Sequence, residues 1–245
     1  MDKILLFNNS VKEEGPQLVT DGLVAHFDAK DAFTQNGNMW FSKIGSFYFT
    51  KKNDTTSSDI IKDGDYVLVK GLNGSNKNNN LEGSSHFKNL SGEKGTVLLS
   101  HINIINQKYQ DLYITSSRTG TSTGVGILKN TSNDAYTAYV NNKAILYVTP
   151  ASDRVNVTEI NKFLLQGLSW DKKNYDSYVN GELQNSQKKT GSLAGENVPV
   201  IGRAGIAGAV RSANIKVGSI YIYNRKLSDE EVMQVYQYEL SLGRK

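Results

Sequence analysis

The last thirty residues constrain the fold of this chain more than any other segment. Residues 220–223 alternate isoleucine with tyrosine, the pattern of a strand with one aliphatic and one amphipathic face. A helix start follows, because Leu227 precedes Ser228 and Glu231 stands three residues beyond the serine, the spacing of a capping box. Gly243 stands where such a helix would end, so we expect a final strand that leads into a helix packed against a sheet. The apolar face of this helix would consist of Val232, Val235, Tyr236 and Leu240.

The rest of the chain has the pattern of short strands separated by turns. Asn180-Gly181 supplies the positive φ angles of a two-residue hairpin, and residues 22–28 alternate with Leu23, Ala25 and Phe27 on one face. Residues 29–45 and 71–86 lack an apolar period and are predicted to be loops, the second of them exposed. Other expected strands cover 45–50, 65–69, 96–105, 111–115, 125–128, 136–140, 144–148, 163–170, 175–179 and 200–202.

Turns recur about every 8–15 residues, and only the terminal segment carries a helical period, which favours a β-sandwich. We therefore predict an all-β fold of two antiparallel sheets with one short C-terminal helix. The 245 residues fit a single large β domain, with residues 1–20 as an N-terminal arm and residues 21–245 as the domain.

Composition excludes several functional classes. There is no cysteine, so disulfides, thiolate metal sites and a cysteine nucleophile are ruled out, and the three histidines do not have a metal-ligand spacing. The net charge is only +4 and the basic residues are scattered, which argues against a nucleic-acid partner. No segment approaches the ~20 apolar residues of a membrane span, and the apolar run at residues 4–7 is too short for a signal peptide.

Four segments of the sequence resemble laminin G-like, concanavalin A-like jelly rolls. They are the opening strand Gly22–Ala29, the hairpin Tyr178–Gly181, the short strand Val200–Gly202 and the closing strand and helix start Ile220–Glu231. The resemblance extends from residue 21 to about residue 242, while residues 30–160 match only in general β character. It implies a jelly-roll sandwich of the kind found in phage tail, baseplate and fibre proteins.

The same superfamily includes β-glucanases of the laminarinase type, which provides an enzymatic alternative. Those enzymes place carboxylates at alternate positions of one strand, so that the two catalytic groups lie about 5–5.5 Å apart. This sequence contains no Glu-x-Asp-x-Glu or Glu-x-Asp-x-x-Glu segment. The acidic run 229–231 belongs to a helix N-terminus, where it complements the helix dipole. We therefore expect a domain that is not an enzyme.

Binding of sugar would need exposed aromatic side chains beside polar groups. Trp40, in a segment expected to be a loop, is the first candidate, followed by Tyr109 and Arg118, whereas Trp170 is expected in the core. No cofactor is predicted. Calcium remains an alternative, because laminin G-like folds often carry an ion at the rim, where Asp28 and Asp31 could supply oxygens.

These observations favour a binding or structural module of a phage virion, associated with the tail or baseplate, that adheres to host-surface carbohydrate. The expected partners are other virion proteins, host glycan and, as an alternative, further copies of this chain, with no membrane insertion. Two other functions remain open: a decoration protein without glycan affinity, and a bacterial secreted or cell-surface carbohydrate-binding module or glycoside hydrolase.

Overall fold

A computed structural model describes residues 15–34, 37–52, 60–70, 80–85, 93–105, 109–114, 125–130, 135–140, 143–148, 160–188, 198–202 and 213–244. It describes the backbone alone for residues 109–114, 128–130, 135–140 and 143–148, except that the side chain of Leu112 is also described. Within these residues none of the helices has the length and apolar character needed to cross a bilayer.

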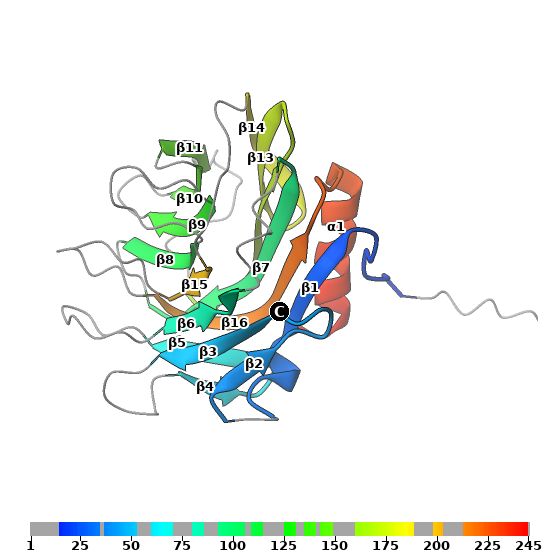
Figure 1. Cartoon of the computed structure of the whole chain (residues 1–245). Helices are drawn as coiled ribbons and strands as arrows, with labels where there is room; N and C mark the ends of the chain where they lie inside the picture. Colours follow the sequence, from blue (N-terminus) through cyan, green and yellow to red (C-terminus); the bar gives the residue numbers. More distant parts are fainter. Residues whose placement is uncertain are drawn as a thin grey trace, which may run out of the picture.

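The strands form two sheets, and every pair of neighbours is antiparallel (Figure 1). The first sheet has the order β14 (Glu182–Lys188), β13 (Asn174–Val179), β12 (Phe163–Trp170), β7 (Gly95–Asn103), β16 (Asn214–Tyr223), β5 (Tyr66–Lys70) and β4 (Ile60–Asp63), with β1 (Leu23–Asp28) also paired to β16. The second sheet has the order β11 (Lys143–Val148), β10 (Ala135–Val140), β9 (Val125–Asn130), β8 (Tyr109–Ile114), β15 (Val200–Ile201), β6 (Asn80–Gly83), β3 (Tyr48–Lys52) and β2 (Met39–Phe41). The predicted sandwich of two antiparallel sheets is confirmed.

The main core lies between the two sheets, where alternate residues of each strand turn inward. Trp40 of β2 contacts Phe27 of β1 edge to face, with ring centroids 5.6 Å apart, and Phe49 of β3 lies on the same cluster. Trp170 is also buried there, as predicted. Further members from both sheets include Val97, Leu99, Ile220, Ile222, Leu81, Ile127 and Ile201.

Strand β16 is central to the first sheet because two strands share one of its edges. Its residues 214–217 pair with β5 and its residues 219–223 pair with β1. The pairing of β16 with β7 shifts by one residue between Val217 and Ser219, which leaves Gly218 in a bulge. A Cβ on Gly218 would lie 2.7 Å from Ser100 Oγ, so a glycine is needed at this position.

The C-terminal helix α1 (Asp229–Ser241) lies against the face of the first sheet that is turned away from the second sheet (Figure 1). The predicted capping box is confirmed, with Ser228 and Glu231 each accepting from the other's backbone N–H. Val232 and Val235 are buried in a second core together with Leu227. The helix ends before Gly243, whose φ is +81°, as the sequence predicts.

The second core also includes the described end of the predicted N-terminal arm. Val19 is buried in it, and its carbonyl oxygen accepts a hydrogen bond of 3.0 Å from the Tyr223 hydroxyl. The Gln234 side chain of α1 donates to the carbonyl oxygen of Gln17 at 2.7 Å. Residues 17–19 therefore pack onto α1, and residues 1–14 of the arm lie outside the described part of the chain.

Local differences from the predicted elements have clear physical causes. Leu23 joins the second core while Ala25 faces the main core, because a register shift between them changes the face of β1. The predicted loop 71–86 contains β6, in which Leu81 is fully buried. The Asn180-Gly181 hairpin is confirmed, with φ angles of +52° and +83°. The expected turn at Asn141 and Asn142 between β10 and β11 lies outside the described residues.

Candidate functional site

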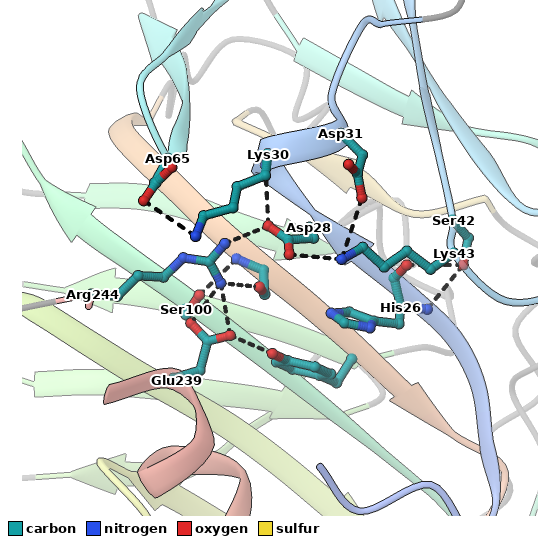
Figure 2. Close-up of polar contacts among 12 residues, drawn as sticks. His26, Asp28, Lys30, Asp31, Ser42, Lys43, Asp65, Ser100, Glu239 and Arg244 are labelled. Atoms are coloured by element: carbon teal, nitrogen blue, oxygen red, sulfur yellow. Dashed lines mark hydrogen bonds and ion pairs between the residues drawn. The ribbon is translucent and has the colours of Figure 1, made fainter. Parts of the chain in front are cut away.

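Charged and polar side chains, most of them buried, come together where α1 ends against the first sheet (Figure 2). We call this group the Arg244 cluster. Alternation along β1 turns His26 and Asp28 away from the main core, and the bulge at Gly218 does the same for Ser219 and Tyr221 of β16. The cluster consists of His26, Asp28, Lys43, Ser100, Ser219, Tyr221, Glu239 and Arg244.

Arg244 connects three elements of the fold at the centre of the cluster. Its side chain has no exposed surface and lies between Asp28 of β1 and Glu239 of α1 (Figure 2). Nη1 donates to both carboxylate oxygens of Glu239, at 2.8 and 3.0 Å, and to the Ser219 hydroxyl of β16. Nη2 donates to Asp28 Oδ1 at 2.5 Å. The guanidinium therefore ties the end of the chain to the first sheet.

Asp28 is saturated with donors. Besides Arg244, its Oδ1 accepts from the backbone N–H of Lys30 at 3.0 Å, and its Oδ2 accepts from Lys43 Nζ at 2.9 Å. Its backbone carbonyl accepts from the Trp40 indole at 3.0 Å. Burial alone would raise the pKa of this carboxyl group, but Lys43 and Arg244 outweigh burial and lower the pKa to about 2.

His26 is held in the neutral form beside these charges. Its ring stacks on Tyr221, with centroids 4.6 Å apart, and its Nε2 has no hydrogen-bond partner within the described part of the chain. Burial lowers the pKa of His26, with a further contribution from Lys43, to about 4. A protonated imidazole here would face two cations, Lys43 and Arg244, and the nearby Asp28 carboxylate, which favours the proton, is already paired with both of them.

Tyr221 and Glu239 have the composition of a catalytic pair but not its accessibility. The Tyr221 hydroxyl donates to Glu239 Oε1, and a tyrosine beside a carboxylate can serve as a nucleophile when it is accessible. Both side chains are completely buried, and burial, followed by the Glu239 charge, raises the pKa of Tyr221 well above its usual value. A nucleophile needs the opposite shift and access to substrate, so the arrangement suits a structural fastening rather than attack on a glycoside.

The alternative calcium position at Asp28 and Asp31 is occupied by a lysine. Lys43 Nζ lies 2.9 Å from Asp28 Oδ2 and 3.3 Å from Asp31 Oδ2, between the two carboxylates (Figure 2). A divalent ion at this position would have to displace the ammonium group. Among the described residues, no group of three or more histidine and acidic side chains is arranged to hold a metal.

Of the three predicted sugar-contact residues, Trp40 is the one whose side chain the structure describes. Trp40 was predicted to be exposed, and this is wrong: alternation within β2 turns its side chain inward, where it has no exposed surface. Tyr109 is the first residue of β8, and the structure describes its backbone and not its side chain. Arg118 lies outside the described residues. Trp40 therefore belongs to the core and not to a binding surface.

Glu239 and Arg244, which organise the cluster, were not predicted from the sequence. A signal for Glu239 was present, because it stands four residues after Val235 and seven after Val232, on the helix face that packs on the sheet. A charged residue at such a position needs a buried partner of opposite charge. Arg244 follows the helix-ending Gly243, and its partners Asp28 of β1 and Ser219 of β16 are 216 and 25 residues away in sequence.

Solved structures with the same fold come from enzymes and from a toxin binding domain. A Trypanosoma rangeli sialidase in complex with sialic acid matches with a TM-score of 0.66 and 13% identity, over 93% of this chain and 36% of the sialidase. A mutant of this sialidase that displays trans-sialidase activity matches with a TM-score of 0.63 and 13% identity, over 93% of this chain and 35% of the mutant. The binding domain of botulinum neurotoxin serotype G matches with 0.62 and 13%, over 89% of this chain and 51% of that one. No family model matches the sequence, and neither does any curated protein.

These likenesses establish a β-sandwich of the jelly-roll, concanavalin A-like type and, at such identities, the fold alone. The chain spans about a third of the length of the sialidases and about half of the toxin domain. They also correct the prediction that the domain is not an enzyme, since the fold occurs in chains of sialidases. The absence of one carboxylate motif had excluded only the β-glucanase arrangement of catalytic groups.

Proposed function

We propose that this chain is a carbohydrate-binding jelly-roll module of a phage virion, located in the tail or baseplate, that contacts glycans of the host surface. The observation that carries the proposal is the fold, which the chain shares over about nine-tenths of its length with a sialidase in complex with sialic acid. The toxin binding domain with the same fold adds a second case in which recognition is the named role.

The distribution of polar groups supports contact through the second sheet. The outer face of the first sheet carries α1 and the Arg244 cluster, whose acceptors and donors are largely used within the protein. The helix lies on the side of the first sheet that is away from the second sheet (Figure 1). In this proposal, residues 1–20 dock the module onto neighbouring virion proteins, and the second sheet is turned toward the host.

An array of bacterial wall polymers, capsular glycans and sialosides, probed with the full chain, tests the carbohydrate part of the proposal. Saturable binding to at least one glycan is expected, and a blank array would leave a decoration protein as the better account. Each bound glycan is then incubated with the protein and assayed for released reducing ends, because the fold also occurs in enzymes. Antibody labelling of purified particles tests the virion assignment, and unlabelled tails and baseplates would contradict it.

A further inference from the structure

The outer surface of the second sheet carries a pair of aromatic rings at its β2–β3 edge. Phe41 of β2 and Tyr48 of β3 are directly opposite each other in the antiparallel pair, and their ring centroids lie 5.9 Å apart at 51°. They alternate with Trp40 and Phe49, which are fully buried in the main core. The two rings therefore point away from the sandwich, and both remain half-buried at the surface.

Polar groups lie on the same face next to the rings. Thr50 stands two residues after Tyr48 and faces Glu82 across the β3–β6 pair. Lys52 stands two residues further along β3, and its Nζ lies 3.7 Å from Glu82 Oε1. The side chains of Lys52 and Glu82 are 48% and 43% exposed, so their polar atoms are accessible to a ligand. The charges of this pair cancel, so the two described charged residues beside the rings on this face add no net charge.

This combination matches the surface of a sugar better than that of a protein. A pyranose has an apolar C–H face, which packs on an aromatic ring, and a rim of hydroxyl groups, which need nearby donors and acceptors. Aromatic side chains bury about 150–250 Å² each, and these two are already half covered. A protein partner would need ~800 Å² on this face, so most of its contacts would have to lie beyond these two rings.

We propose that Phe41 and Tyr48 form a stacking platform for a neutral pyranose residue, with Thr50 and the Lys52–Glu82 pair bonding its hydroxyl groups. This proposal rests on the glycan-binding function above and names the surface that would perform it. A neutral sugar fits better than an anionic one because Lys52 already has a carboxylate partner, Glu82.

Titration of the full chain with two neutral probes, the tetrasaccharides of glucose and of N-acetylglucosamine, and with anionic sialyllactose tests the platform. We expect a neutral probe to bind more tightly than sialyllactose. Phe41→Ala and Tyr48→Ala should each weaken neutral binding by at least about fivefold, and the double variant by more. Tyr66→Ala removes a half-buried tyrosine from the first sheet and serves as the matched control, with unchanged affinity.

A second variant separates loss of the platform from loss of folding. Tyr48→Trp keeps an aromatic ring at the surface and should retain binding. The two native tryptophans, Trp40 and Trp170, are buried, so a blue shift of emission on titration reports the introduced indole.

Four outcomes would overturn the proposal, and they show whether the proposed function fails with it. Neutral binding that survives both alanine substitutions places the ligand elsewhere and leaves the proposed function intact. If the emission of Tyr48→Trp does not change when the ligand is bound, the ligand also lies elsewhere and the proposed function stands. Tighter binding of sialyllactose that Lys52→Gln abolishes contradicts the neutral class. Absence of binding to all three probes and to the array removes both the platform and the glycan-binding function.

Discussion

Replacement of Arg244 by methionine should destabilise the domain by about 3–5 kcal/mol, the cost of breaking a buried ion pair from one side. Methionine keeps much of the aliphatic length and removes the charge. Glu239 would then retain the Tyr221 hydroxyl as its hydrogen-bond donor among the described residues, in a position with no exposed surface. Asp28 would keep Lys43 and the Lys30 amide, so most of the cost falls on Glu239.

Equilibrium unfolding in urea, followed by tryptophan emission, measures this loss because both tryptophans are buried. For a domain of this size each kcal/mol shifts the melting temperature by about 2–4 °C, so the variant should melt roughly 6–20 °C below the parent. Lys172→Met is the control, since the pair of Lys172 with Glu93 is largely exposed and its loss should leave the unfolding midpoint unchanged.

Addition of Glu239→Gln to Arg244→Met should recover part of the lost stability, because a neutral amide costs less to bury than a carboxylate. The reasoning is refuted if Arg244→Met alone unfolds within about 1 kcal/mol of the parent, a typical value for an exposed pair. It is equally refuted if the double variant is no more stable than the single one, since the buried Glu239 charge would then not be the source of the cost.

Three further predictions concern pH, the hairpin and the helix. The His26 pKa of about 4 lies below the unfolded value of 6.5, so the contribution of neutral His26 to stability is fully present above pH 7. This contribution falls as the pH drops toward 4, by up to about 3 kcal/mol. The variant His26→Phe should flatten this part of the profile of melting temperature against pH, and an unchanged slope would show that the folded-state pKa is not depressed. Gly181→Ala should lower the free energy of unfolding in urea by about 1–3 kcal/mol, because φ at Gly181 is +83° and a Cβ would lie 2.9 Å from Met233 Sδ. An unchanged free energy would mean that the turn relaxes to accept the methyl group. Ser228→Ala removes half of the capping box and should lower the unfolding free energy by about 0.5–2 kcal/mol, whereas a stability equal to the parent would mean that the helix start does not depend on the cap.

Local signals in the sequence were sufficient for most of the secondary structure and for the fold class. The hairpin at Asn180-Gly181 and the capping box at Ser228 depend on neighbours within a few residues, so their chemistry can be read directly. Strand β12 has the predicted bounds Phe163–Trp170. The segment around Trp40 was predicted to be a loop, because the three residues of β2 are too few to show an alternating pattern.

The β-bulges show why strand faces could not all be assigned in advance. The register shift in β1 sends Leu23 and Ala25 to different cores, although their spacing of two residues predicts a common face. The bulge at Gly218 likewise sets which residues of β16 face α1. Both shifts depend on partner strands that lie far away in the chain.

The sequence by itself determined the alternation, turns and capped helix that make this a two-sheet β-sandwich, because each of those choices depends on backbone preferences and on apolar periods within about ten residues. Only the tertiary structure decided which charged residues are buried and which aromatic rings are exposed. Arg244 acquires its role because folding places Asp28, Ser219 and Glu239 around it, and Trp40 becomes core while Phe41 and Tyr48 remain at the surface because β2 pairs with β3 in one register. Contacts between residues distant in sequence depend on how the sheets assemble, and local pattern does not encode that assembly.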